Sequence, residues 1–292
     1  MAPLISILTP VYNCADTLAL GLASLQAQSL ADWECIVVDD GSTDHPSATV
    51  AAASDRRIRL CRFPSNRGRG FARQKALERA AGNYVGWLDG DDWMYPEKLR
   101  LQLDLLEREP ELAVVSTGAA IVNQKRELVG IRRSSNDAPV LRGRIDSVGS
   151  LPFVFPASIL RAELAKSTGF AASHRRCEDA DFVWRGMLGK RYAIINHPLY
   201  VYREAGVTSP AKVLSSLNAC CDIYWNLAGV GLVERAAAVA GARLKQAAYC
   251  GAALLGMWDR VIARRSRAPL AGERLRYEAI LRELTTKPDR MR

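Results

Sequence analysis

Three carboxylates stand within four residues in the segment Asp89-Gly90-Asp91-Asp92, directly after the apolar stretch 84–88. Carboxylates placed so closely repel one another, and a bound cation relieves that repulsion. Because hard oxygen ligands suit Mg²⁺ or Mn²⁺, the segment is a candidate metal site that could also hold a diphosphate. The alternative is a solvated acidic turn, since Asp and Gly are common turn residues.

A second acidic pair, Asp39 and Asp40, follows the apolar stretch 35–38. A carboxylate in this position can accept hydrogen bonds from a nucleobase N–H or a ribose hydroxyl, as an acidic residue does in dinucleotide-binding folds. The alternative is an Asx turn in which Ser42 or Thr43 caps a helix.

Glu178 and Asp179 open a predicted helix, with Asp181 in the same turn. The positive end of a helix dipole favours ionised carboxylates. A general base must be ionised and within hydrogen-bond reach of its proton, so this segment is a candidate for deprotonating an alcohol. Helix capping by acidic residues is the alternative.

Basic residues surround the start of another predicted helix, at Arg67, Arg69 and Arg73. Cations and exposed backbone N–H groups before a helix form an anion site, which makes Arg73 a candidate donor-binding residue. The segment lacks both the dinucleotide and the P-loop glycine patterns. A solvated basic loop is the alternative.

Alternating strands and helices must position these residues. Apolar runs predict the strands and periodic segments predict the helices. The strands are expected at 4–8, 35–38, 58–62, 84–88, 113–117, 192–195 and 199–202, with a loop over 134–150. The helices are expected to begin at Asp16 and to cover 70–81 (closed by Gly82), 96–109 (begun by Pro96), 161–167, 178–188 and most of the chain from 211 onward.

This alternation predicts an α/β fold in which helices cover both faces of a mainly parallel sheet. Ligands bind such sheets outside the carboxyl ends of the strands. Thr9–Asn13 and both acidic segments fall at these ends, so polar residues are expected to converge there.

Taken together and in order, six segments resemble those of glycosyltransferase family 2, whose members have the GT-A fold. They are ILTPVYN (7–13), VVDDGSTD (37–44), NRGRGFARQKAL (66–77), YVGWLDGDDWMYPEKL (84–99), GF with CEDADFVWR (169–170 and 177–185) and PLYVYR (198–203). The resemblance implies a catalytic domain with a Rossmann-like sheet over 1–210. A basic helical extension over 211–292 lies outside it.

The resemblance implies an inverting enzyme that moves a sugar from a nucleotide-sugar donor, with UDP as the expected nucleotide, to a hydroxyl of a glycan or lipid-linked acceptor. Pro10 and Tyr12 would line the base pocket, with Tyr12 stacking on the base. Asp40 would bind the base, and Asp39 would support that loop.

The same resemblance assigns the reacting groups. Asp89 would touch the ribose or the metal, and Asp91 would hold Mg²⁺ or Mn²⁺ on the diphosphate. Asp179 would be the base, with Glu178 orienting the acceptor. A single displacement of this kind needs no enzyme nucleophile.

One position departs from the family pattern. Many relatives carry a histidine two residues after the Tyr-Arg pair, where it assists the metal or diphosphate, and here that position is Ala205. Arg203, Glu204 or water is then expected to fill the gap, or fewer protein groups hold the metal.

The net charge of +9 lies mostly in residues 211–292, which hold 14 Lys or Arg against 7 Asp or Glu. Residues 236–267 combine an Ala/Leu-rich stretch with arginines, as in helices that lie on anionic membrane surfaces. The alternatives are a solvated helical surface, a cap on the catalytic domain, or a contact between copies of the chain in a homo-oligomer.

The sequence shows neither a signal peptide nor an apolar run of the roughly 18 residues that a transmembrane helix needs. Its seven cysteines form no CxxC pair, a usage typical of reduced thiols. A cytoplasmic location is therefore expected, with the cytoplasmic face of the membrane as a candidate docking place.

Three other classes compete with a glycosyltransferase. A nucleotidyltransferase would need a Gly-rich basic loop after the first strand, where this chain has TPVYNCADT (9–17). A non-catalytic nucleotide-binding scaffold would not need the intact Asp40, Asp89, Asp91 and Asp179. Nucleic acid is not an expected partner, because no recognised binding module accompanies the basic charge.

Overall fold

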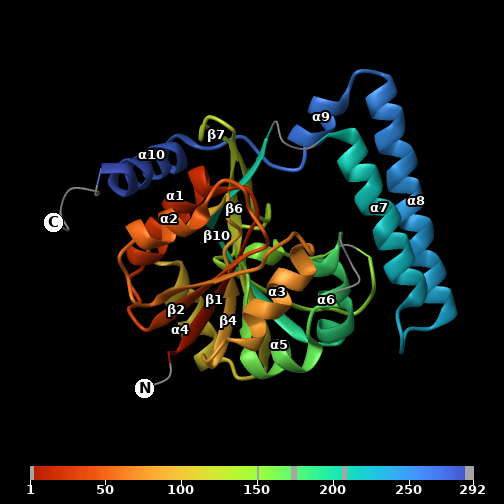
Figure 1. The fold of residues 1–292 in the computed structure, drawn as a ribbon. Coiled ribbons are helices and arrows are strands. Elements are labelled where there is room, and N and C mark those ends of the chain that lie inside the picture. The colour runs from red at the N-terminus through yellow and green to blue at the C-terminus, as the bar shows by residue number, and fades with distance from the viewer. Residues whose placement is uncertain (1–2, 150, 172–175, 206–208, 287–292) are drawn as a thin grey trace.

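The structure is a computed structural model that describes residues 3–149, 151–171, 176–205 and 209–286 (Figure 1). Its strands are β1 (Ile5–Val11), β2 (Trp33–Asp39), β3 (Ile58–Arg62), β4 (Tyr84–Trp87), β5 (Trp93–Met94), β6 (Leu112–Asn123), β7 (Leu128–Arg132), β8 (Val140–Arg144), β9 (Ile159–Arg161) and β10 (Arg191–Ala205). Its helices are α1 (Ala15–Gln26), α2 (Pro46–Ala52), α3 (Arg69–Glu78), α4 (Lys98–Arg108), α5 (Ala162–Thr168), α6 (Glu178–Met187), α7 (Pro210–Asn226), α8 (Leu232–Leu254), α9 (Trp258–Ala263) and α10 (Ala271–Thr286), with a 3-10 turn at Phe155–Ala157.

All ten strands form one sheet in the order β3-β2-β1-β4-β9-β6-β10-β5, with β7 paired to β6 and β8 to β10. The strands β3, β2, β1 and β4 are parallel. Beyond β4 the sheet is mixed, because β9 runs antiparallel to both β4 and β6. The predicted α/β architecture is confirmed.

Helices cover both faces of the sheet and enclose two apolar layers (Figure 1). One layer joins the sheet to α1, α4 and α10, and the other joins it to α3, α5, α6 and α7. Of the parallel strands, β1, β2 and β4 are buried on both faces, as expected for the centre of such a sheet, whereas the edge strand β3 exposes Arg59 and Arg62. The two layers fix the carboxyl ends of β1, β2 and β4 at one edge of the sheet.

The C-terminal helices α7 and α10 pack on the rest of the chain at separate places. Tyr277 of α10 is buried against Trp93, with ring centroids 5.6 Å apart, and its hydroxyl donates to the carbonyl of Arg126 at 2.6 Å. Tyr224 of α7 packs against Trp184 of α6. The division into domains at residue 210 remains a prediction.

Most expected elements match the observed ones, and the differences come from long-range contacts. Gly82 does not close α3, which ends at Glu78. A Cβ at Gly82 would instead lie 2.7–2.9 Å from the backbone of Ile5 and Ser6. Gly82 is therefore required by a close approach to β1 and not by a helix end.

Three further expectations need correction. The helix expected from Pro96 begins at Lys98, after a turn. The loop expected over 134–150 contains β8, which pairs antiparallel with β10. The two short strands expected at 192–195 and 199–202 are parts of the single bulged strand β10.

Candidate active site

A cavity of about 580 Å³ lies at the carboxyl ends of β1, β2, β4 and β10. Each of these ends contributes polar side chains, as the position of ligands in open α/β sheets predicts. The lining comprises Pro10 to Cys14, Asp16, Thr17, Asp40, Asp44, Asn66, Gly68, Arg69, Ala72, Asp89, Gly90, Asp91 and Arg203. The convergence expected from the sequence is thus observed.

The loops after β1 and β2 bind each other and form one wall of the cavity. The Asn13 backbone N–H donates to Ser42 Oγ at 3.1 Å, and the Asn13 side-chain oxygen accepts from the Thr43 N–H at 2.9 Å. Asn13 has φ 51°, a conformation that Asn tolerates better than most residues. Tyr12 remains 49% exposed beside this loop pair, so its ring is available for stacking.

Asp39 and Asp40 have different positions. Asp39 is fully buried, accepts from the Ser42 N–H at 2.8 Å and pairs with Arg62 at 3.3 Å. Asp40 lines the cavity and accepts from the backbone N–H groups of Arg67 and Gly68 at 2.7–3.1 Å. Asp39 thus holds the loop, while Asp40 ties the loop to the start of α3. Ser42 and Thr43 do not cap α2, whose N-cap residue is His45.

Gly90 is required by packing. A Cβ at this position would lie 2.4 Å from Cys14 Sγ and 3.0 Å from a methyl of Val11. This close passage brings Asp89 and Asp91 to the cavity wall. The sequence leaves open whether 89–92 forms a ligand site or a solvated turn, and in the structure Asp89, Gly90 and Asp91 line the cavity while Asp92 does not.

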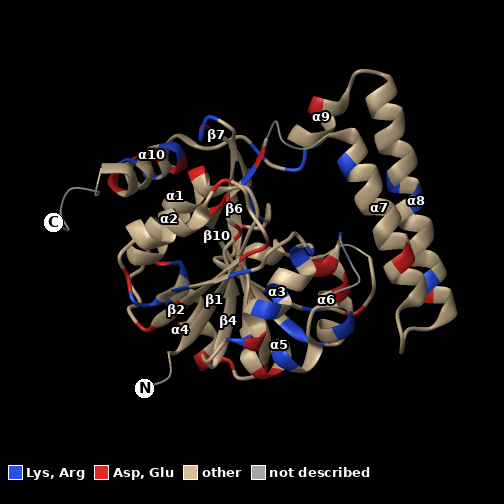
Figure 2. Ribbon diagram, viewed as in Figure 1, with Lys and Arg blue, Asp and Glu red and all other residues tan. Residues whose placement is uncertain are grey.

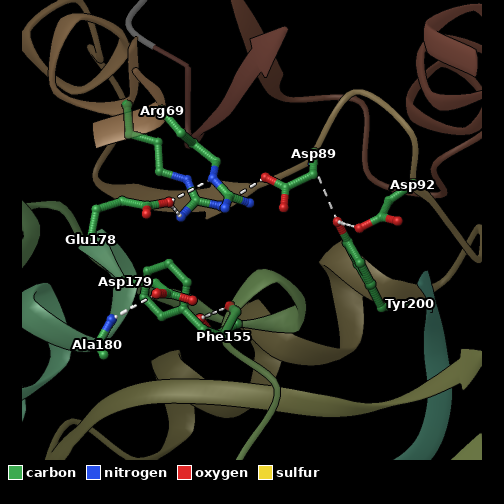
Figure 3. Close-up of polar contacts among 10 residues, drawn as sticks. Arg69, Asp89, Asp92, Phe155, Glu178, Asp179, Ala180 and Tyr200 are labelled. Atoms are coloured by element: carbon green, nitrogen blue, oxygen red, sulfur yellow. Dashed lines mark hydrogen bonds and ion pairs between the residues drawn. The ribbon is translucent and has the colours of Figure 1, made fainter. Parts of the chain in front are cut away.

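Arg73 lies beneath the cavity and not in its lining. It is 1% exposed and donates to Asp89 Oδ1 and to Glu178 Oε1 at 2.8 Å each. Arg69, whose side chain is half exposed, also contacts Glu178 Oε1 at 2.8 Å (Figure 3). The residue of the basic segment that faces the ligand space is therefore Arg69, while Arg73 joins α3 to the acidic loop and to α6.

Opposite charges and burial set the proton affinities of this cluster. Burial alone would raise the pKa of Asp89, but Arg73 and Arg69 lower it below its ordinary value. Burial raises the pKa of Glu178 despite the same two arginines. Asp91 also has a raised pKa, because burial and the charge of Asp89 outweigh the attraction of Arg203 and Arg69.

Asp92 holds the end of β10 in place at the edge of the cavity. Its carboxylate accepts from Tyr200 Oη at 2.8 Å and from the Arg203 backbone N–H at 2.9 Å. Tyr200 Oη in turn accepts from the Asp89 N–H at 3.3 Å (Figure 3). Desolvation raises the pKa of Asp92 well above its ordinary value. These contacts fix the end of β10 against the acidic loop.

Asp179 stands at the first turn of α6, next to the charge cluster but outside the cavity lining. It is half-buried, and its Oδ1 accepts from the Ala180 N–H at 2.9 Å. Its charge acts on both Arg69 and Arg73. Asp181, by contrast, pairs with Arg185, which also donates to the carbonyls of residues 168 and 169. Asp181 and Arg185 therefore stabilise the packing of α6 on α5.

The donor set at the cavity wall fits a divalent cation that the ligand helps to hold. In the described part of the chain no three His, Cys, Asp or Glu side chains are arranged so that they alone could hold a metal ion. Mg²⁺ is commonly bound by one or two carboxylates together with substrate phosphates, and Asp89 and Asp91 supply that number. The raised pKa of Asp91 marks a carboxylate whose charge is incompletely compensated.

Sequence reasoning missed the role of Tyr200 and did not single out Arg69 as the arginine that faces the ligand. Tyr200 couples Asp89 to Asp92, and Arg69 takes the position assigned to Arg73. Of the groups suggested to replace the missing histidine, Arg203 lines the cavity, whereas Glu204 points to ion pairs with Arg132 and Arg265. In a regular strand Tyr200 and Arg203 fall on opposite faces, so the alternation of residues in β10 does not predict that both serve this site.

A model of glycosyl transferase family 2 matches residues 6–169. The putative glycosyltransferase EpsE of Bacillus subtilis is 30% identical over 210 residues, which are 69% of this chain and 73% of that protein. The chain therefore belongs to glycosyl transferase family 2 and is a glycosyltransferase, as the motifs predicted.

Other similarities cover less or are more distant. The E. coli enzyme WfgD, named as a UDP-Glc:α-D-GlcNAc-diphosphoundecaprenol β-1,3-glucosyltransferase, is 36% identical over 103 residues, which are 35% of this chain and only 41% of that protein. The structure of S. aureus TarS residues 1–349 with UDP has a TM-score of 0.63 at 22% identity, over 81% of this chain and 69% of that one. This likeness confirms the GT-A fold.

Proposed function

We propose that the protein transfers a sugar, with inversion, from a nucleotide-sugar donor to a hydroxyl of a glycan or lipid-linked acceptor. The observation that carries the proposal is one cavity lined by Tyr12 and Asp40 on one side and by Asp89 and Asp91 on the other. An aromatic ring with a carboxylate suits a base and ribose, and the acidic pair suits a metal-bound diphosphate. UDP is the expected nucleotide, as in the complex of TarS.

The chain's own groups can bind and orient the donor. Tyr12 offers its half-exposed ring to the base, beside Pro10. Arg69 contributes positive charge on the diphosphate side. Arg73 contributes indirectly, because it holds Asp89 in place from beneath the cavity. Arg73 was expected to bind the donor directly, and we propose that it supports the acidic loop instead.

Asp89 and Asp91 would hold Mg²⁺ or Mn²⁺ against the diphosphate. When bound, the cation neutralises charge that develops on the departing nucleoside diphosphate. Asp92 is excluded from this set, because it is 1% exposed and does not line the cavity.

Asp179 is the proposed base. It lies in the first turn of α6 and is more exposed than Glu178. As the acceptor oxygen attacks the anomeric carbon, Asp179 takes the hydroxyl proton and the bond to the diphosphate breaks. Glu178 pairs with Arg73 and Arg69. Through these contacts it would hold the start of α6 in place and so orient the acceptor beside Asp179.

We further propose that the corner between α8 and α9 contacts anionic lipid. Leu254 and Leu255 are 89% and 74% exposed, and the exposed Arg260 and Arg264 follow. Figure 2 shows few charged residues along α8 itself. No helix in the described residues combines the length and apolarity that crossing a membrane requires. Apolar side chains beside arginines suit a helix that lies in the interface.

Substitution of the base tests the proposal. Asp179→Asn should abolish sugar transfer to acceptors in a membrane or glycan extract, because an amide cannot take the proton. Binding of UDP with Mn²⁺ should be kept. Asp222→Asn, on α7, is the control and should transfer at the wild-type rate. Transfer by Asp179→Asn near the wild-type rate would sink the base assignment.

A further inference from the structure

We infer that Arg203 binds the donor diphosphate, and that Arg265 of the C-terminal segment positions Arg203 through Glu204. The inference rests on the proposed function, because it takes the ligand to be a nucleoside diphosphate. It assigns to the segment beyond the family match, which ends at residue 169, a part in donor binding.

Arg203 has the chemistry and the place for this role. It lines the cavity, and its charge acts on Asp91. Its Nε is buried and has no hydrogen-bond partner among the described residues. A guanidinium presents several donors in a planar fork that matches phosphate oxygens. A phosphate beside Asp91 would satisfy the buried donor.

The backbone of Arg203 is fixed on both sides. Its N–H donates to Asp92 Oδ1 at 2.9 Å. The next residue, Glu204, has a side chain only 11% exposed, which pairs with Arg132 of β7 and with Arg265 Nη1 at 3.2 Å. The two anchors hold the end of β10 and therefore limit where the Arg203 side chain can reach.

Arg265 is itself held in place by the C-terminal segment. It follows α9, and its Nη2 donates to Tyr249 Oη of α8 at 2.9 Å. Two backbone hydrogen bonds of 2.8 and 2.9 Å join Ile131 to Arg267. A Cβ at Gly130 would lie 2.3 Å from Ser266 Oγ, so the two segments are in close contact. The C-terminal segment thus reaches the strand end that carries the cavity arginine.

An ion pair that only stabilises the fold makes a different prediction. Loss of such a pair would lower the melting temperature and weaken the binding of every ligand alike. Loss of a positioning contact would weaken the binding of ligands that carry the diphosphate and leave the binding of ligands without it unchanged. UDP and uridine share the base and ribose, so the ratio of their affinities separates the two roles.

The test measures the affinities of UDP, with Mn²⁺, and of uridine by calorimetric and ligand-detected NMR titration. Arg203→Gln should weaken UDP about tenfold or more, as expected for a lost charged hydrogen bond, and leave uridine unchanged. Arg265→Gln should weaken UDP binding about three- to tenfold, and Arg265→Lys should weaken it less. The double variant, Arg203→Gln with Arg265→Gln, should bind UDP no more weakly than Arg203→Gln alone. Arg282→Gln, at an exposed arginine of α10, should match the wild type.

The inference is overturned if Arg265→Gln binds UDP as tightly as the wild type does, or if its affinities for UDP and for uridine fall by the same factor. Additive losses in the double variant would also overturn the positioning role. Failure of the wild type to bind any nucleoside diphosphate would instead contradict the proposed function itself.

Discussion

Asp89 and Glu178 bind the two ends of one buried guanidinium, since Arg73 donates to each of them at 2.8 Å. Asp89 belongs to the loop that follows β4, and Glu178 begins α6 directly before the proposed base. A single side chain therefore fixes the loop proposed to bind the metal relative to the proposed base. The arrangement joins three segments that lie far apart in the sequence.

Removal of this guanidinium should unfold the protein more easily. Arg73→Met should lower the free energy of unfolding by about 3–5 kcal/mol, because it leaves buried carboxylates without their partner. Urea denaturation followed by circular dichroism measures the loss. Arg69→Met is the control, and a smaller loss is expected because the Arg69 side chain is 51% exposed. Equal losses in the two variants would contradict the central position of Arg73.

Asp91 should lower stability in the absence of ligand. Burial and the charge of Asp89 raise the pKa of folded Asp91 above its ordinary value of 3.8. Between the ordinary and the raised pKa the folded state binds more protons than the unfolded chain, so stability falls as the pH rises. Asp91→Asn should therefore melt at a higher temperature than the wild type at neutral pH. The same variant should lose the effect of Mn²⁺ on UDP binding.

Two results would contradict this account of Asp91. One is a melting temperature for Asp91→Asn below that of the wild type at neutral pH. The other is an Mn²⁺-dependent gain in UDP affinity that survives the substitution. Asp104→Asn, on the surface helix α4, is the control for a lost carboxylate and should leave both quantities unchanged.

Lys98 should reduce stability at neutral pH. It is fully buried, its Nζ has no hydrogen-bond partner among the described residues, and burial lowers its pKa from 10.5 to about 7. Lys98→Met should stabilise the fold by about 1–3 kcal/mol at pH 7, the cost of an unsatisfied buried polar group.

The pH dependence of Lys98→Met distinguishes this cause from general packing. Between pH 7 and 10.5 the unfolded chain binds the proton that folded Lys98 has lost, so wild-type stability rises with pH in that window. In urea titrations, the difference in free energy of unfolding between Lys98→Met and the wild type should therefore shrink from pH 7 to pH 9.5. Lys75→Met, on the surface of α3, should show no such trend, and a constant advantage for Lys98→Met would reject the titration.

Lipid contact at the α8–α9 corner makes a separate prediction. Leu254→Glu with Leu255→Glu should abolish flotation with vesicles that contain anionic lipid, because it places charge where apolar side chains would enter the interface. Val129→Glu, an exposed apolar residue on β7, is the matched control and should float as the wild type does. Failure of the wild type itself to float would reject the membrane proposal.

Local patterns predicted the parts of the structure that short segments determine. The strand expected at Ile58–Arg62 is β3 with the expected bounds, and the acidic segments fall at strand ends because strands and helices alternate. The cavity-facing places of Asp40, Asp89 and Asp91 followed from that topology. Recognition of the family added the expected role of Asp179, which remains a prediction.

Contacts between distant segments explain what the sequence did not reveal. Arg73 was expected to face the ligand, but its partners Asp89 and Glu178 come from other elements. The edge strand β8 is only half-buried and polar, so it lacks the apolar pattern of a buried strand. The bridge between Ile131 and Arg267 joins segments that no local pattern relates.

The most direct test is calorimetric titration of the wild type with UDP, dTDP and GDP, each with and without Mn²⁺. The account predicts that one nucleotide, expected to be UDP, binds at a single site and that Mn²⁺ strengthens its binding. Asp40→Asn and Asp91→Asn should each weaken this binding, the latter by removing the Mn²⁺ effect. The absence of binding by any of the three nucleotides, with Mn²⁺ present, would contradict the assignment of the cavity as a nucleotide-sugar site.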